Sequence, residues 1–358
     1  MNSKLSLYLD LVRFSAAVVV FLGHLSAQRL TGGFLWQFSA IADDAVVVFF
    51  VLSGYVIAWV THARHATAAD YVVARASRIY SVAVPAVLLT FALDTVGTLI
   101  DPGAYVTHVV DQNRPLWWEV VSSLTFLNQI WYLSTDIGSM LPYWSLGYEV
   151  WYYVLFGLAV FIADRRRAWL WVGSVLLFVG PRIAVLFPLW LLGVLLYRTM
   201  AHRPVSTRVG ALAFAASVLL YALYLWQGRH WLAAHDAVSP WVGEKSILNR
   251  YAVAAIFGLN LVGAVGLSHL RLRVQPRLEH CVRRCAETTF TVYLVHLPVA
   301  HFLSTVTPWP ATDAANRVFM FVGTGAIVAV MAVLCEQRKG WWAHGLRRLL
   351  FARRGLQP

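Results

Sequence analysis

The sequence predicts an all-α fold, a polytopic membrane bundle of about ten helices with both chain ends in the cytoplasm. Composition is the first reason. Of the 358 residues, 59% are hydrophobic and only 13% are charged, whereas soluble domains average about 45–50% apolar and about 25% charged residues. The second reason is that the apolar residues gather into windows of about 20 residues, long enough for a helix to cross a bilayer.

The predicted spans follow these apolar windows along the chain. They cover 6–26, 41–61, 79–99, 145–163, 168–181, 183–199, 208–226, 251–269, 287–306 and 316–336. Gly180 and Pro181 predict a tight turn between the fifth and sixth spans. Segment 118–133 is apolar but short and holds Asn128 and Gln129, so we interpret it as an interfacial or re-entrant piece.

The basic residues predict the orientation. With the N-terminus inside, the predicted inner loops hold about three times as many Lys and Arg as the outer loops. The formal net charge of +12 is therefore explained by topology, and no nucleic-acid partner is expected. The first span is not a cleavable signal peptide, because Arg13 interrupts it and no small-residue cleavage site follows. We expect one transmembrane domain over 1–340 and a basic cytoplasmic tail over 341–358.

The cysteines predict neither a disulfide framework nor a metal site. There are three, Cys281, Cys285 and Cys335, and an odd number without a regular spacing does not build a disulfide scaffold. His280 lies beside Cys281, but a structural zinc site takes four ligands and only three lie close in the sequence here.

The first span carries ionisable residues that hydrocarbon disfavours, namely Asp10, Arg13 and His24. At about 100° per residue, Arg13 and His24 lie on one helix face, about 16 Å apart along the axis. A guanidinium suits a phosphate, and an imidazole suits proton transfer. Their arrangement favours a site that holds an anion at one depth and moves a proton at another.

Two further basic or polar motifs allow more than one interpretation. Ser53, Gly54 and Tyr55 lie in the middle of the second span, where a Ser-Gly pair is either a helix-packing device or part of a site. Arg75 and Arg78 lie three positions apart on one helix face before the third span. They either fix the topology or form, with Arg13, a cytoplasmic clamp for phosphate groups.

The fourth and ninth spans carry the remaining candidates. Glu149, one turn below the outer end of its span, lies at the predicted depth of His24 and could orient it. The alternative is a solvated carboxylate at a helix start. The ninth span holds Tyr293 and His296. A histidine in a span is either functional or a hydrogen-bonded core residue.

These motifs together resemble those of membrane-bound acyltransferase family 3, which includes bacterial O-antigen and exopolysaccharide O-acetyltransferases and macrolide acyltransferases. The matching residues are Arg13 and His24; Phe49, Phe50, Leu52, Ser53, Gly54 and Tyr55; Arg75, Arg78 and Ile79; Trp144, Ser145, Leu146 and Glu149; and Tyr293, Leu294, His296 and Pro298. The chain departs from the family pattern at Ser81, where a proline is common, and at Val47, where an aspartate is common.

The resemblance implies transfer of an acyl group, most often acetyl, from acyl-coenzyme A to a hydroxyl of a carbohydrate or of a glycosylated or lipid-linked acceptor. It also implies a multi-pass protein of the bacterial cytoplasmic (inner) membrane. On this basis, His24 and Glu149 are the expected catalytic residues. The coenzyme's phosphates are assigned to Arg13, Arg75 and Arg78. Substrate contact or structural support is assigned to Ser53, Tyr55, Trp144, Ser145, Tyr293 and His296, and no metal is expected.

Alternatives stay open at this point. His24 acts either as a base or as a transient acyl carrier, and the acyl group either crosses the membrane or reacts on one side. A rival class is a non-catalytic polytopic carrier that exports a glycan or lipid. A third is a sensor or scaffold bundle, for which Arg13 and His24 would be dispensable.

Overall fold

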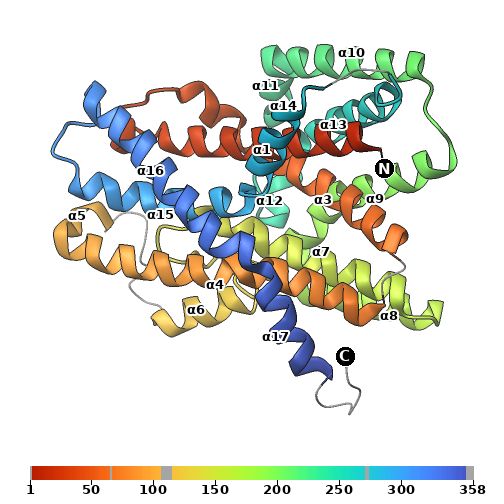
Figure 1. Cartoon of the computed structure of the whole chain (residues 1–358), viewed down its shortest axis with the longest axis horizontal. Helices are drawn as coiled ribbons and strands as arrows, with labels where there is room; N and C mark the ends of the chain where they lie inside the picture. The colour runs from red at the N-terminus through yellow and green to blue at the C-terminus, as the bar shows by residue number, and fades with distance from the viewer. Residues whose placement is uncertain (1, 65–66, 106–114, 271–273, 352–358) are drawn as a thin grey trace. The chain divides into compact units, whose positions relative to one another are not determined.

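The computed structural model describes residues 2–64, 67–105, 115–270 and 274–351. Over these ranges the chain is helical with short connections and contains no strand (Figure 1). The ten predicted spans coincide with α1 (Ser3–Leu25), α3 (Ala42–Arg64), α4 (Ala68–Ile100), α7 (Trp144–Phe161), α8 (Arg165–Val179), α9 (Pro181–His202), α10 (Thr207–Leu223), α13 (Ile247–Leu267), α15 (Thr289–Val306) and α16 (Ala314–Cys335). The prediction of an all-α polytopic bundle is confirmed.

Within the described ranges, eight helices are long and apolar enough to cross a membrane, and α7 and α8 are not among them. The 15 residues of α8 span about 22 Å, less than the ~30 Å hydrocarbon core of a bilayer. The two helices are consecutive in the chain. If neither helix crosses the membrane, only the loop between them changes its predicted side of the membrane. The predicted location of both chain ends stays the same.

Shorter helices lie between and after these long helices in the described ranges. They are α2 (Gln28–Thr31), η1 (Trp36–Ile41), α5 (Pro102–Tyr105), α6 (Leu116–Leu124), η2 (Leu141–Tyr143), η3 (Tyr224–Gly228), α11 (Arg229–Ala234), α12 (Ser239–Val242), α14 (Pro276–Ala286), η4 (Glu336–Arg338) and α17 (Lys339–Phe351). Residues 125–140, between α6 and η2, are irregular. This irregular stretch falls largely within the segment interpreted from the sequence as interfacial or re-entrant.

Local chemistry explains where the helices start and stop. Gly180 has φ +83° and Pro181 is the first residue of α9, so the predicted turn between α8 and α9 is confirmed. Helix α4 begins at Ala68, well before the predicted start at 79. The Thr67 side chain accepts a hydrogen bond from the Asp70 amide at 3.1 Å and caps the helix there. The hydropathy window marked only the apolar part of this helix.

The chain divides into two compact units, the first comprising Met1–Ala16, Asp43–His65 and Ser174–Ala286. In this unit, α10 packs closely on α13. A Cβ added to Gly210 would lie only 2.7 Å from the Cα of Gly266, which shows how closely the two backbones approach. Its buried Asp44 accepts hydrogen bonds from Arg229 at 2.8 Å and from Tyr221 at 3.1 Å. The carboxylate of Asp44, near the start of α3, is therefore paired, as an apolar environment requires.

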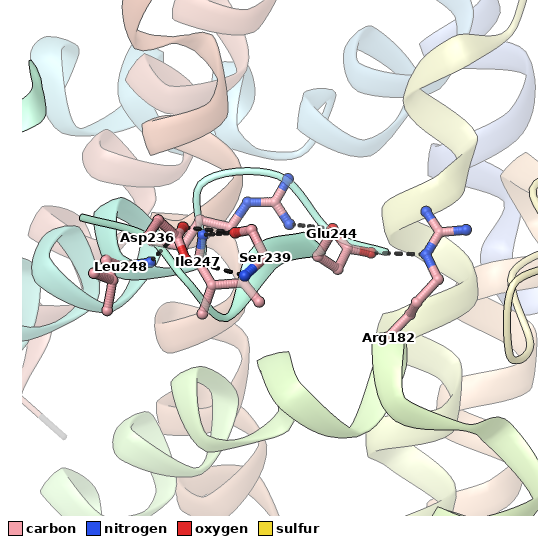
Figure 2. Close-up of polar contacts among 7 residues, drawn as sticks. Arg182, Asp236, Ser239, Glu244, Ile247 and Leu248 are labelled. Atoms are coloured by element: carbon pink, nitrogen blue, oxygen red, sulfur yellow. Dashed lines mark hydrogen bonds and ion pairs between the residues drawn. The ribbon is translucent and has the colours of Figure 1, made fainter. Parts of the chain in front are cut away.

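A second polar cluster of the first unit precedes α13 (Figure 2). The carboxylate of Glu244 accepts hydrogen bonds from Arg182 at 3.2 Å and from Arg250 at 2.7 Å. Nearby, Asp236 accepts from the hydroxyl of Ser239 at 2.6 Å and from its amide at 3.0 Å. Partial burial alone would raise the pKa of Asp236, but the hydrogen bonds from Ser239 and from neighbouring backbone amides outweigh it and lower that pKa.

The second unit comprises Ala17–Ala42, Ala66–Gly173 and Glu287–Pro358. Helix α15 packs against both α4 and α16, and α17 packs against α4 (Figure 1). The start of α15 is fixed by Glu336, which accepts from the amide of Thr291 at 3.1 Å and from its hydroxyl at 3.0 Å. Most of α15 is buried, and this helix carries two of the predicted site residues.

Candidate functional site

A pair of histidines forms the most distinctive part of the second unit. His24, near the end of α1, and His296, in the middle of α15, place Nδ1 and Nε2 2.9 Å apart. Their rings stack with centroids 5.1 Å apart and an interplanar angle of 13°. His296 is fully buried. The two predicted site histidines, 272 positions apart in the sequence, are therefore direct partners.

The hydrogen bonds of His296 determine the protonation pattern of the pair. Its Nδ1 lies 2.7 Å from the carbonyl oxygen of Val292. A carbonyl can only accept, so this nitrogen carries a proton. When both rings are neutral, Nε2 of His296 must accept a hydrogen bond from Nδ1–H of His24. The Nε2 of His24 then carries a lone pair, the form that a general base requires.

Tyr293 connects α15 to the start of α7. Its hydroxyl lies 2.7 Å from the hydroxyl of Ser145, and both residues are buried. Tyr293 stands one helical turn before His296, so this contact fixes the turn of α15 that presents the imidazole. Trp144, the first residue of α7, packs edge-on against Tyr148 with ring centroids 5.2 Å apart. The Ser145–Tyr293 contact thus joins the start of α7 to α15, and Trp144 packs within α7.

Glu149 and Arg75 both contact one tyrosine, Tyr153. The hydroxyl of Tyr153 donates a hydrogen bond to the Glu149 carboxylate, and the guanidinium of Arg75 lies 5.9 Å from the centre of the Tyr153 ring. This distance suits a cation–π contact. Arg75 was expected in an inner loop, but it lies two turns inside α4 because that helix begins at Ala68. Arg78 stands one turn further along the same helix.

The predicted pairing of Glu149 with His24 stays a prediction. The partners described above are Tyr153 for Glu149 and His296 for His24. Tyr153 was not singled out from the sequence, although it follows Glu149 by four positions, the spacing at which helical side chains meet. The position of Asp44 against Arg229 was also missed, because nothing local in the sequence connects α3 with the residues after α10.

The comparison with protein families decides the identity of the chain at the family level. The model of one family, described as an acyltransferase domain, matches residues 6–336. The chain belongs to membrane-bound acyltransferase family 3. Comparisons with curated proteins and with solved structures gave no match. The chain is therefore a multi-pass membrane acyltransferase, as the motifs had indicated.

The acyltransferase uses its second motif in helix packing. Gly54 of α3 approaches α9 so closely that a Cβ there would overlap the backbone oxygen of Trp190, and a Cβ on Gly193 would overlap that of Val51. The indole of Trp190 donates to the hydroxyl of Ser53 at 3.2 Å. Of the two interpretations of the Ser-Gly pair, the close approach of α3 and α9 supports the packing one.

The other motif residues of the first unit have the following positions. Tyr55 packs edge-on against Tyr197 of α9, with ring centroids 5.6 Å apart. Arg13 lies half-buried in the first half of α1. Over the part of the chain that the structure describes, no group of three or more His, Cys, Asp and Glu residues is placed to hold a metal ion. Cys281, Cys285 and Cys335, all within the described ranges, form no disulfide bond.

Proposed function

We propose that this acyltransferase moves an acyl group, usually acetyl, from acyl-coenzyme A to a hydroxyl of a carbohydrate or of a glycosylated or lipid-linked acceptor. The observation that carries the proposal is the His24–His296 pair, in which a buried imidazole accepts from Nδ1–H of His24. This arrangement leaves Nε2 of His24 as a base in a protein of an acyltransferase family. We also propose that the protein works in a bacterial cytoplasmic membrane.

The reaction follows from this base. Nε2 of His24 takes the proton of the acceptor hydroxyl while the acceptor oxygen forms a bond to the thioester carbonyl carbon. The carbon–sulfur bond then breaks, and the proton on His24 passes to the departing thiolate. The products are an ester and free coenzyme A. His296 supports the step because its Nε2 accepts a hydrogen bond from Nδ1–H of the cationic His24, as an orienting group does for a catalytic base.

The remaining motif residues receive roles that the proposal must test. Glu149 steadies the positive charge that develops on His24. Arg75 and Arg78 hold the phosphates of the coenzyme, because guanidinium forks match phosphate oxygens. Arg75 lies beside Tyr153, and the hydroxyl of Tyr153 donates to Glu149. One tyrosine therefore contacts both a proposed phosphate-binding residue and Glu149.

Radiolabelled acetyl-coenzyme A and protein purified into nanodiscs provide the test. With no acceptor supplied, water takes the acetyl group, so the wild-type protein should slowly release acetate and free coenzyme A. The His24→Ala variant should lose this release by roughly a hundredfold or more, the contribution of a general base. His269→Ala, which removes an exposed histidine after α13, should match the wild type. Label that stays on the protein and needs His24 would indicate a transient acyl-histidine instead of direct transfer.

Two results would contradict the proposal. Undiminished release by a well-folded His24→Ala protein would remove His24 from the chemistry. No release and no binding of acetyl-coenzyme A by the wild type would favour a non-catalytic carrier or a different donor.

A further inference from the structure

The irregular segment between α6 and η2, residues 125–140, contains two buried amide side chains. Asn128 is 0% exposed and Gln129 is 1% exposed. The backbone on either side is strained, because Phe126 and Trp131 adopt φ angles of 58° and 53°, a region that bulky residues rarely occupy. Such strain persists only where the surroundings fix it, and it is frequent where a ligand binds.

Each of the two amides has an atom without a hydrogen-bond partner. In the part of the chain that the structure covers, neither Oδ1 of Asn128 nor Nε2 of Gln129 has a hydrogen-bond partner. The orientation of Asn128 is determined, since its Nδ2 donates to the carbonyl of Thr135 at 3.3 Å and a carbonyl can only accept. A buried polar atom left unpaired is destabilising. The two adjacent residues therefore offer one acceptor atom and one donor atom that have no hydrogen-bond partner.

These amides lie against the first turn of α7. A Cβ on Gly147 would be 3.1 Å from Oδ1 of Asn128 and 3.8 Å from Cγ of Gln129. Gly147 lies two positions from Ser145 and two from Glu149. Ser145 contacts Tyr293 of α15, the helix that carries His296. The segment is thus connected through α7 to the histidine pair, within one unit of the chain.

We propose that Asn128 and Gln129 bind hydroxyl groups of the acyl acceptor and so select a polyhydroxylated acceptor, an inference that rests on the proposed function. A hydroxyl both donates and accepts hydrogen bonds. It can therefore satisfy the oxygen of Asn128, and a neighbouring hydroxyl can satisfy the nitrogen of Gln129. A thioester carbonyl only accepts and would leave Asn128 unpaired. The acceptor–donor pair accordingly fits a carbohydrate better than it fits the acyl donor.

Matched probes test the inference, namely tritiated octyl glucoside, which carries several hydroxyls, and octanol, which carries one. Protein in nanodiscs should bind octyl glucoside more tightly than octanol. Gln129→Met keeps the side-chain volume and removes the donor, and Asn128→Ala removes the acceptor. Together they should weaken octyl glucoside binding about tenfold and leave octanol binding unchanged. With acetyl-coenzyme A present, the KM for octyl glucoside should rise similarly, while acetyl-coenzyme A binding stays within twofold.

Asn249→Ala is the matched control, because Asn249 is also a buried asparagine with an unbonded oxygen but lies on α13 in the first unit. It should bind octyl glucoside like the wild type. Gln129→Met is also measured alone, because Asn128→Ala additionally removes the hydrogen bond from Asn128 to the carbonyl of Thr135. Unchanged octyl glucoside binding by a folded Gln129→Met protein would overturn the inference, with the two amides then bonded to buried water. Selective binding without acetyl transfer would support the inference and count against only the proposed function.

Discussion

Removing His296 should slow the acyltransferase reaction without removing His24. His296→Phe keeps a buried ring of similar shape but eliminates Nε2, which lies 2.9 Å from Nδ1 of His24. In the wild type this nitrogen is the acceptor that keeps the Nδ1–H form of His24 and steadies its cationic form. Without it, the neutral imidazole of His24 can place its proton on Nε2, where the base should be.

The size of the effect follows from the nature of the lost bond. A hydrogen bond to a charged group contributes about 1.5–3 kcal/mol, and every 1.4 kcal/mol corresponds to about a tenfold change. kcat/KM for acetyl transfer should therefore fall roughly 10- to 150-fold in His296→Phe. His296→Gln, which offers an amide oxygen as a replacement acceptor, should recover part of this loss.

The assay is coenzyme A release under conditions where the amount of folded protein is measured by size-exclusion chromatography. A double-mutant cycle with His24→Ala distinguishes the mechanism from packing. If His296 acts through His24, the double variant should be no slower than His24→Ala alone. A His296→Phe protein with kcat/KM within twofold of the wild type would refute the reasoning, and so would losses that multiply in the double variant.

Two further predictions concern the fold. Gly54→Ala and Gly193→Ala should each reduce stability by about 1–3 kcal/mol and lower the yield of monodisperse protein, because their methyl groups would meet backbone oxygens that cannot rotate away. Gly325→Ala is the control, because its Cβ would meet no described atom within 4 Å. Equal melting curves for all three variants would contradict this prediction. Because the fold lowers the pKa of Asp236, its carboxylate stabilises the protein above the ordinary Asp value of about 4 and loses this effect as pH falls through the lowered value. The melting-temperature advantage of the wild type over Asp236→Asn should therefore shrink below about pH 4, whereas a difference independent of pH would be incompatible with that role.

The sequence was sufficient to locate the long helices, because a bilayer imposes length and apolarity on every helix that crosses it. It was less informative about helix ends. The predicted start of α4 at 79 reflects the point where polar residues cease, but a helix can begin in polar sequence when a residue such as Thr67 caps it. Helices α7 and α8 also matched apolar windows, although α8 is too short and α7 not apolar enough to stand with the eight candidate spans.

The site was predictable residue by residue but not as a set of contacts. Each motif is local, so His24 and His296 could both be proposed from their own surroundings. Their pairing joins α1 to α15, and no periodicity connects positions so far apart in the chain. The contact of Glu149 with Tyr153 lies within one helix and could have been derived from the spacing alone. The approach of Gly54 to Trp190 required knowledge of which helix faces α3.

The motif residues consequently divide by the kind of effect that their loss should have. In the second unit, His24, His296 and Glu149 carry polar contacts whose loss changes charge and proton position. In the first unit, Ser53 and Gly54 lie where α3 meets α9, and their loss changes how closely two helices approach. Variants of the first group should therefore lower the rate per folded molecule. Variants of Gly54 should lower the number of folded molecules and leave the rate of each survivor nearly intact, so one family's motifs serve two separable physical purposes.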